Sequence, residues 1–235
     1  MPADRSPTML ITAGPTWEPV DDVRVVSNRS SGRLGVALAT AAAEAGCATH
    51  LLIGPNVAPP ARDRFDGEVE RFTSARSLGE ALERLCPDCD ALLMAAAVAD
   101  YEPVELTLSD GARLPLPLPR GTKLRRSRQP LSIVLRPTPD LLAREAARKR
   151  AEQLFVGFAL APRDQLATVA REKLRRKGVE CVVANPLETM DAPTISATLY
   201  ATGPAASLDG LAVSDMPKEA FAAWLIGRLL PLLRR

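Results

Sequence analysis

Short apolar runs alternate with helix-like segments along most of this 235-residue chain, and that alternation limits the possible folds more than any other feature. The run at 91–98 consists of small apolar residues, which is typical of a strand covered on both faces. Strands that alternate with helices at this spacing form a parallel sheet with right-handed crossovers. We therefore predict an α/β fold in three layers, with helices on both faces of a parallel sheet. Predicted strands cover 9–12, 49–53, 68–72, 91–98, 154–158 and 180–184, predicted helices cover 34–45, 77–85, 139–150, 163–177 and 217–233, and late antiparallel strands are predicted at 194–202 and 211–214.

The alternation breaks in the middle of the chain, at residues 103–136. Asp110-Gly111 is a dipeptide typical of a hairpin turn, and it is flanked by two runs in which apolar and polar residues alternate. We predict a small antiparallel strand insert here, within one domain that covers residues 1–235. The predicted strands of the insert cover 104–108, 113–118 and 131–135.

The composition weighs against several classes of protein. A hydrophobic fraction of 46% in a chain of 235 residues is enough for a sizeable core. The net charge of +2 gives no general signal for nucleic-acid binding, and there is no 18-residue apolar run to cross a membrane. We expect a cytoplasmic protein that binds neither nucleic acid nor membrane. Because His50 is the only histidine and Cys86 and Cys89 form a lone C-x-x-C pair, we favour neither histidine-dependent nucleophilic catalysis nor a metal or redox role for the cysteines.

About twenty residues, which we predict to be loop, separate the first strand from the first helix, against the 2–6 that are usual for such a connection. The loop ends in Ser30, Ser31 and Gly32, at the predicted helix N-terminus, where free N–H groups and the helix dipole favour an anion. An ordinary serine N-cap is the alternative. The chain has neither a P-loop motif nor G-x-G-x-x-G after the first strand, and Gly54-Pro55 stands where a dinucleotide fold has its ribose-binding acidic residue.

The run at 91–98 leads directly into Ala99 and Asp100. In open α/β sheets, ligands collect outside the carboxyl ends of the strands. Small side chains there let a flat ligand approach the backbone, and Asp100 is placed to hold a ribose hydroxyl, a base edge or a metal. The alternative is that the alanines serve packing and that Asp100 caps a turn.

Basic residues gather in two places. One group occupies a short loop of the insert, where a solvated loop or a nucleic-acid patch is the alternative. No aromatic residue interleaves these cations, and so compact a cluster suits a triphosphate better than a single-stranded nucleic acid. Lys173 and Lys177 lie four residues apart, on one face of a predicted helix. The loop group consists of Arg120, Lys123, Arg125, Arg126 and Arg128.

Two longer runs are more specific: residues 27–32 read Ser-Asn-Arg-Ser-Ser-Gly, and residues 95–101 read Ala-Ala-Ala-Val-Ala-Asp-Tyr. Together with shorter matches in the same order, they resemble the phosphopantothenate–cysteine ligases, also called phosphopantothenoylcysteine synthetases. Many bacterial members carry a flavin-dependent decarboxylase domain in front, and we expect this chain to be the stand-alone form. The shorter matches are Thr12-Ala13-Gly14, Glu18-Pro19, Val23-Arg24, Lys123-Leu124-Arg125-Arg126, Pro139-Asp140-Leu141, Val156-Gly157-Phe158-Ala159, Lys173, Lys177-Gly178 and Val183-Ala184-Asn185.

The resemblance implies a Rossmann-like domain that forms a homodimer, partly through the insert at 103–136, whose basic loop also serves as an active-site flap. It implies an Mg²⁺-dependent reaction in two halves. The carboxylate of 4'-phosphopantothenate attacks the α-phosphate of a nucleoside triphosphate, CTP in bacterial members, and pyrophosphate leaves. The amine of L-cysteine then attacks the acyl-nucleotide, which gives 4'-phosphopantothenoyl-L-cysteine and CMP. A separate phosphopantothenoylcysteine decarboxylase is a further implied partner.

The resemblance also implies roles for single residues at the matched positions. Asn28 would contact the reacting carboxyl group, and Lys123 would neutralise phosphate charge in the transition state. Asp100 is the one candidate metal ligand. The other implied substrate-binding residues are Gly14, Arg24, Ser30, Ser31, Gly32 and Ala96, and the implied nucleotide-binding residues are Ala95, Ala96, Asp100, Lys123, Thr138, Pro139, Asp140, Leu141, Phe158, Lys173 and Lys177.

The chain also departs from the family pattern. Trp17 stands where members usually have arginine, and Thr138 stands where they usually have asparagine, so the preference for CTP over ATP stays open. Two other functions remain as alternatives, a dinucleotide-dependent oxidoreductase and a non-catalytic nucleotide-binding scaffold. The missing acidic residue after the second strand weighs against the first, and the joint presence of Asn28, Asp100 and Lys123 weighs against the second.

Overall fold

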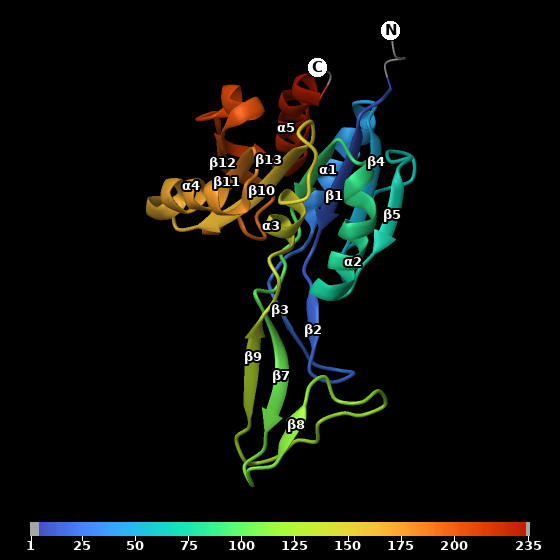
Figure 1. Ribbon diagram of the computed structural model, residues 1–235, viewed down its shortest axis with the longest axis vertical. Coiled ribbons are helices and arrows are strands. Elements are labelled where there is room, and N and C mark those ends of the chain that lie inside the picture. Colours follow the sequence, from blue (N-terminus) through green and yellow to red (C-terminus); the bar gives the residue numbers. More distant parts are fainter. Residues whose placement is uncertain (1–4, 234–235) are drawn as a thin grey trace.

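The computed structural model describes residues 5–233 and contains one large sheet with helices on both faces (Figure 1). The predicted α/β class is confirmed: the sheet has eight strands in the order β13-β12-β11-β10-β6-β1-β4-β5, parallel except for β12 and β13. Its strands are β1 (Thr8–Ala13), β4 (Ala48–Ile53), β5 (Glu68–Arg71), β6 (Ala91–Met94), β10 (Leu154–Ala161), β11 (Cys181–Pro186), β12 (Thr194–Ala201) and β13 (Ala212–Pro217). The helices are α1 (Arg33–Glu44), α2 (Ala75–Leu85), α3 (Leu141–Ala146), α4 (Leu166–Lys177) and α5 (Lys218–Leu233).

The three layers follow from the two-residue period of the central strands. Met9 and Ile11 of β1 point to one face of the sheet, where they pack in a core that includes residues of α1 and α5. Leu10 points to the other face and belongs to a second core, with residues of α2, α3 and α4. Because both faces are covered at the centre of the sheet, the strands β1, β6, β10 and β11 are mostly apolar and buried, whereas the edge strand β5 is largely exposed.

Helix α1 lies unusually close to β1 because Gly35 has no side chain. A Cβ added at Gly35 would lie 2.5 Å from the Ala13 Cβ and 2.7 Å from the Thr12 carbonyl oxygen. No larger residue fits without moving the helix. This close contact fixes the N-terminus of α1 at the carboxyl end of β1.

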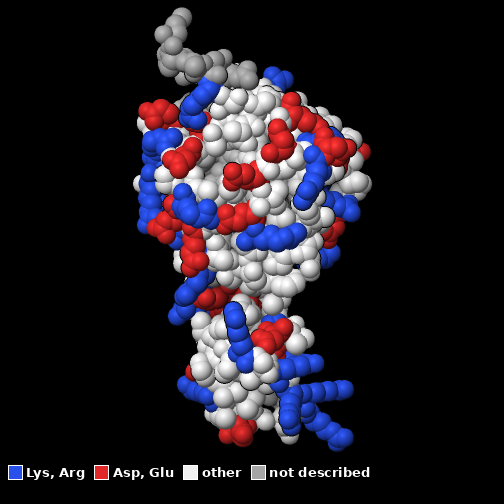
Figure 2. Space-filling view, turned by 90° about the vertical axis from the view of Figure 1, so that its right-hand side faces the viewer, with Lys and Arg blue, Asp and Glu red and all other residues white. Residues whose placement is uncertain are grey.

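An arm projects from the body at that same end of the sheet (Figure 1). It contains an antiparallel sheet of β7 (Tyr101–Thr107), β8 (Arg113–Pro115) and β9 (Ser132–Pro137), in the order β8-β7-β9. The basic loop of the insert lies toward the free end of the arm, away from the body, where Figure 2 shows lysine and arginine side chains projecting into solvent.

A second hairpin lies beside this sheet, and the sequence analysis missed it. The segment after the first strand is not all loop, because β2 (Trp17–Pro19) pairs with β3 (Val25–Ser27). Its turn is fastened to the basic loop through Asp21, whose carboxylate accepts hydrogen bonds from the Leu124 N–H at 2.9 Å and from the Arg24 guanidinium. Burial alone would raise the pKa of Asp21, but three backbone N–H groups and the Arg24 guanidinium outweigh it and hold the pKa far below its usual range.

Several predicted boundaries are wrong by a few residues. The strand predicted at 91–98 ends at Met94, because the backbone after it bonds to side chains and loops instead of a ladder. The helix predicted at 139–150 begins two residues later, because Asp140 is the N-cap of α3, and it ends at Ala146. At the last predicted helix, Pro217 ends β13 and α5 begins one residue later.

The two cysteines of the C-x-x-C pair and the single histidine lie within the fold and contact neighbouring elements. Cys86 and Cys89 are buried, and Gln153 donates hydrogen bonds to the carbonyl oxygens of both. His50 is part of β4 and faces Glu68 and Glu70 of the edge strand β5. Within residues 5–233, no helix combines the length and the hydropathy that a membrane span requires.

Candidate active site

The site is built around the turn at 95–100, which follows β6. Threonine hydroxyls take the place of strand partners: the Ala96 N–H donates to the Thr12 hydroxyl at 3.0 Å, and the Ala99 N–H donates to the Thr16 hydroxyl at 3.0 Å. From the far side, the Thr138 N–H donates to the Asp100 carbonyl at 2.9 Å. The turn is therefore held rigidly at the carboxyl end of the sheet, with Asp100 exposed beside it.

Asn28 reaches this turn from the end of the β2–β3 hairpin. Its side-chain amide donates to the Val98 carbonyl oxygen at 2.8 Å. That bond fixes the plane of the amide and leaves a second N–H donor and the amide oxygen, on an exposed side chain. Asn28 can therefore offer an oriented N–H to a group bound beside the turn.

The N-terminus of α1 lies next to Asn28. Its N-cap is Gly32, with φ of 72°, and no side chain caps the helix, so the alternative of a serine cap is wrong. The first N–H groups of a helix have no partner inside it. Arg33 and Gly35, whose N–H groups are among them, line the cavity described next, together with Gly32. The positive end of the helix dipole thus faces that cavity.

These elements enclose a cavity of about 510 Å³, which we call the main cavity. It lies between the 28–35 segment, the turn at 95–100 and the ends of β10 and β11. It brings together eight of the residues predicted from the sequence. They are Asn28, Ser30, Ser31, Gly32, Ala95, Asp100, Phe158 and Lys173.

A side cavity of about 270 Å³ adjoins it and shares Val98, Asp100 and Lys173 with it. All four residues predicted at 138–141 line the side cavity, and so does Lys177. The Lys177 ammonium donates to Asp140. Burial would raise the pKa of Asp140, but Lys177 and the Ala143 N–H outweigh it, so the pKa lies below its usual value. This rim therefore holds an ionised carboxylate and a cation side by side.

Lys173 stands between the two cavities. Its ammonium donates to the Phe158 carbonyl oxygen. Burial and then the neighbouring Lys177 charge lower the pKa of Lys173 to about 8. Lys173 is therefore a cation near neutral pH that an anionic ligand would stabilise.

Four predicted residues line neither cavity. Gly14 lies directly beneath Gly32, and a Cβ at Gly32 would be 3.2 Å from the Gly14 nitrogen. The backbone N–H of Ala96 donates a hydrogen bond to the Thr12 hydroxyl. Arg24 and Lys123 lie on the arm, where Arg24 is paired with Asp21. Within one chain, the two arm cations are thus not brought to the main cavity.

The main cavity also contains polar residues that the sequence analysis did not predict as site residues. Arg29 pairs with Asp191 at 2.9 Å across its mouth. Asn185 lies near the carboxyl end of β11 and directly follows the strand predicted at 180–184. The same signal singled out Asp100, and it could have found Asn185. Lys218 gave no such signal, because a lysine in the first turn of a helix is ordinarily solvated.

The main cavity offers few protein ligands for a metal ion such as Mg²⁺. Within residues 5–233, no group of three or more histidine, cysteine or acidic side chains could hold a metal ion. Asp100 and Asp191 are the carboxylates of the main cavity. Mg²⁺ commonly binds through one or two carboxylates together with substrate phosphates, and these residues fit that mode.

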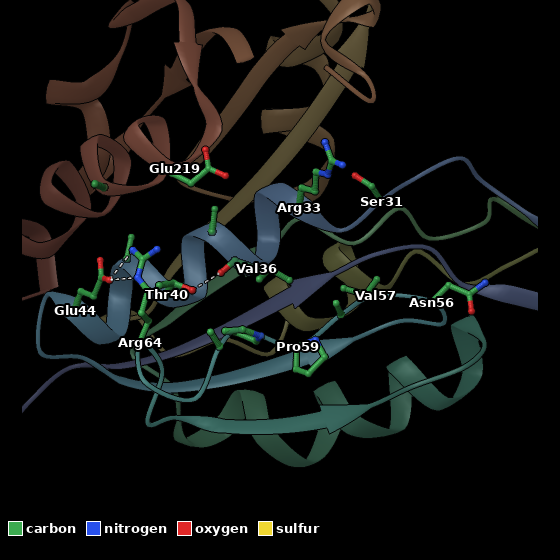
Figure 3. A pocket seen from close by; sticks show the side chains of 16 residues that line it. Ser31, Arg33, Val36, Thr40, Glu44, Asn56, Val57, Pro59, Arg64 and Glu219 are labelled. Atoms are coloured by element: carbon green, nitrogen blue, oxygen red, sulfur yellow. Dashed lines mark hydrogen bonds and ion pairs between the residues drawn. The ribbon is translucent and has the colours of Figure 1, made fainter. Parts of the chain in front are cut away.

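A groove along α1 is as large as the main cavity, at about 510 Å³ (Figure 3). Its walls include Val36 and Pro59, and one of its two arginines, Arg64, pairs with Glu44 at 2.7 Å. Ser31 is the one predicted site residue in its lining. The main cavity, with its convergent polar groups, is the better candidate for chemistry.

The chain is similar to known proteins over nearly its whole length. The profile of the "DNA/pantothenate metabolism flavoprotein C-terminal domain" family matches residues 5–232. A relative named "Cysteine/Cysteine sulfinic acid decarboxylase", from an unknown prokaryotic organism, is 41% identical over 180 residues, which cover 77% of this chain and 46% of that protein. The "Coenzyme A biosynthesis bifunctional protein CoaBC" of Mycobacterium bovis is 36% identical over 185 residues, or 75% of this chain and 41% of the relative.

The chain thus spans less than half the length of both of these relatives. Among solved structures, the C-terminal domain of a CoaBC protein superposes with a TM-score of 0.73 at 26% identity, over 97% of this chain and 96% of that one.

Proposed function

This chain belongs to the DNA/pantothenate metabolism flavoprotein C-terminal domain family, and from that membership and the site geometry we propose that it is a phosphopantothenate–cysteine ligase. The proposed reaction joins 4'-phosphopantothenate to L-cysteine through an acyl-nucleotide, in coenzyme A biosynthesis. One observation carries the proposal. An oriented amide N–H from Asn28, the carboxylate of Asp100 and the buried ammonium of Lys173 meet in one cavity beside an uncapped helix N-terminus.

In the first half of the reaction, a carboxylate oxygen of phosphopantothenate forms a bond to the α-phosphorus, and the bond from that phosphorus to pyrophosphate breaks. Negative charge grows on the leaving pyrophosphate. Lys173 and the free N–H groups of α1 face the space where such charge would lie. Fixed donors aimed at developing charge are usually the largest single contribution to catalysis.

In the second half, the cysteine nitrogen forms a bond to the acyl carbon, and the bond from that carbon to CMP breaks. The acyl oxygen becomes an oxyanion on the way. The second N–H of Asn28 is placed to donate to it, because the bond to Val98 holds the first.

We propose the side cavity for the nucleobase and ribose, because its rim offers both a donor and an acceptor in Lys177 and Asp140. CTP is the proposed nucleotide, with ATP as the alternative. Mg²⁺ would enter on the nucleotide phosphates, with Asp100 as its candidate protein ligand, and would neutralise phosphate charge. Thr138 stands where family members usually have asparagine, and it has no side-chain amide to offer the nucleotide. Its hydroxyl donates to the Ala99 carbonyl oxygen at 2.5 Å instead.

We further propose a homodimer formed through the arm. On β9, apolar side chains are exposed in the single chain, with Val134 at 47% and Leu135 at 44% of their full accessible surface. A second copy would cover them, and the arm would then bring Arg24 and Lys123 to the partner's main cavity. Both cations lie outside the cavity of their own chain, which favours such an exchange.

A coupled pyrophosphate assay tests the function. Pyrophosphate should be released in repeated turnovers only when phosphopantothenate, L-cysteine and CTP are all present, and mass spectrometry should show phosphopantothenoylcysteine. ATP in place of CTP measures the nucleotide preference. Carbon dioxide release from cysteine or cysteine sulfinic acid should be absent, and its presence without pyrophosphate release would favour the decarboxylase named among the relatives.

A further inference from the structure

Lys218 is a buried cation in the wall of the main cavity, and the proposed reaction gives it no role. It is the first residue of α5 and only 7% of its surface is exposed. Its ammonium donates to the Thr189 carbonyl oxygen at 3.3 Å. In the part of the chain that the structure describes, no carboxylate lies within ion-pair distance of it, so two of its three N–H donors have no protein partner. A buried cation without a partner is costly unless a ligand supplies one.

The charges around Lys218 favour an anion. Burial and then the Arg33 charge lower the pKa of Lys218, while Asp191 and Glu219 act in the opposite direction. Arg33 and Lys218 therefore repel each other across a space that the N-terminus of α1 also faces. An anion between them would relieve the repulsion and would accept from the unused donors.

A purely structural role is a weaker explanation. Thr189 lies in the 187–189 segment that borders the cavity, and two other bonds already fix it. The Asn185 amide donates to the Thr189 hydroxyl at 2.7 Å, and that hydroxyl donates to the Pro186 carbonyl at 2.7 Å. The segment thus does not need Lys218 to hold its shape.

We propose that Lys218 is a further binding residue of this site and that its ammonium donates to a phosphate group of one of the reactants. This inference rests on the proposed function. Two reactants carry phosphate, the nucleoside triphosphate and phosphopantothenate, and the geometry of the binding group is the same for both. Arg33 and the N–H groups of α1 would complete the phosphate-binding site.

Calorimetric titration of paired ligands tests the proposal and separates the two sources. Lys218→Met removes the charge and keeps the length of the side chain, and Lys218→Arg keeps the charge. If Lys218 binds the nucleotide, Lys218→Met weakens CTP binding by about tenfold or more and leaves cytidine binding unchanged. If it binds the other reactant, phosphopantothenate binding falls by a similar factor while pantothenate binding is unchanged. In either case Lys218→Arg should recover most of the loss.

Two outcomes would overturn the proposal. One is unchanged binding of all four ligands by Lys218→Met, and the other is an equal loss for all four that Lys218→Arg does not recover, which would indicate a structural role. Failure of the proposed function itself gives a different result, because the wild-type protein would then not catalyse the three-substrate reaction at all.

The wild-type protein provides a test that does not depend on the folding of a variant. Lysine acetylation by acetic anhydride, followed by peptide mass spectrometry, should be slower at Lys218 when sodium pyrophosphate or phosphopantothenate is present. Lys149 is the internal control, since it is nearly as buried, pairs with Glu180 and lies outside both cavities. Equal acetylation of Lys218 with and without every phosphate ligand would contradict the proposal.

Discussion

At the scale of single residues, the bond from Asn28 to the Val98 carbonyl makes a prediction about the two half-reactions. In the first half the substrate carboxyl group loses charge, and in the second its oxygen gains charge, so an amide donor matters mostly in the second. Asn28→Asp should therefore still release one equivalent of pyrophosphate per site, while amide formation falls by about two orders of magnitude or more. Quenched-flow mass spectrometry should then show the acyl-nucleotide accumulating.

Two variants control this experiment. Asn28→Ala removes the donor without placing a carboxylate against the Val98 carbonyl, and it should show the same separation of the two halves. Asn56→Asp makes the same chemical change in a loop at the α1 groove, at a residue with φ of 59° that aspartate tolerates. Asn56→Asp should leave turnover unchanged. Normal turnover with cysteine by Asn28→Asp would show that Asn28 is only a loop residue.

Lys173 predicts how nucleotide affinity depends on pH. Its pKa of about 8, lowered by burial and by Lys177, means that it is charged below pH 8 and neutral above it. The dissociation constant for CTP should therefore rise above pH 8, by up to about tenfold per unit, until the pKa of the complex is reached. Lys173→Arg should abolish this rise, because arginine stays charged. A wild-type dissociation constant that is flat from pH 7.5 to about 9.5 would contradict the assignment.

The same residue predicts a stability change with a definite sign. Between pH 8 and about 10.5, the unfolded chain holds a proton on Lys173 that the folded protein has lost. The free energy of unfolding should therefore rise with pH across this window in the wild-type protein, relative to Lys173→Met, in urea titrations.

Residue chemistry was predictable where a polar side chain follows a buried strand or a helix N-terminus follows a loop. Asp100 and Gly32 were found in this way. Lys173 was predicted from its spacing to Lys177 on a helix face, and Asn28 only from the family resemblance. The structure brings Asp100, Gly32, Lys173 and Asn28 together. Lys218 was not predictable, because its burial depends on α5 packing next to the 187–189 segment, and no local sequence pattern shows that contact. The hydrogen bond from the Leu124 N–H to the Asp21 carboxylate was not predictable either, because it joins two loops whose sequences are typical of solvated loops.

At the scale of elements, the surroundings of two helical glycines predict that alanine substitution changes stability in opposite directions. A Cβ at Gly35 would clash with the Ala13 Cβ at 2.5 Å, so Gly35→Ala should lower the free energy of unfolding by about 1–3 kcal/mol. Gly227 lies in α5 with nothing within 4 Å of an added Cβ. Gly227→Ala should therefore raise stability by about 0.5–1 kcal/mol, through helix propensity alone.

Urea unfolding measures both changes, and Gly227→Ala is the matched control for Gly35→Ala. Because displacement of α1 would also move its free N–H groups, Gly35→Ala should bind CTP more weakly as well. Equal stability of the two variants would mean that α1 can shift without cost.

The central elements of the body were predictable because the strands β1, β6, β10 and β11 are compact apolar runs and amphipathic helices such as α2 have a clear period. The β2–β3 hairpin was not, since its strands are only three residues each and one of them ends in Pro19. What stabilises it is a contact distant in sequence, the Leu118 N–H donating to the Val20 carbonyl at 2.9 Å. Turn and strand signals within the hairpin are too weak to show this.

At the scale of the whole molecule, the position of Lys123 on the arm predicts that active sites are shared between subunits. Lys123→Gln removes the arm cation, and Asn28→Ala removes the amide donor from the cavity of the same chain. Each variant alone should be impaired by roughly two to three orders of magnitude in turnover. In a mixed dimer, the intact cavity of one subunit would meet the intact arm of the other.

Mixing the two variants after mild dissociation should therefore restore activity. Random exchange makes about half of the dimers mixed, and each mixed dimer has one intact site out of two, so recovery should approach a quarter of the wild-type rate. Val134→Lys, which places a charge on the exposed apolar strand β9, should block both dimer formation and this recovery while the monomer stays folded. If the mixture gains no activity although native mass spectrometry shows mixed dimers, then Lys123 acts within its own chain or not at all, and the proposed exchange of arms is wrong.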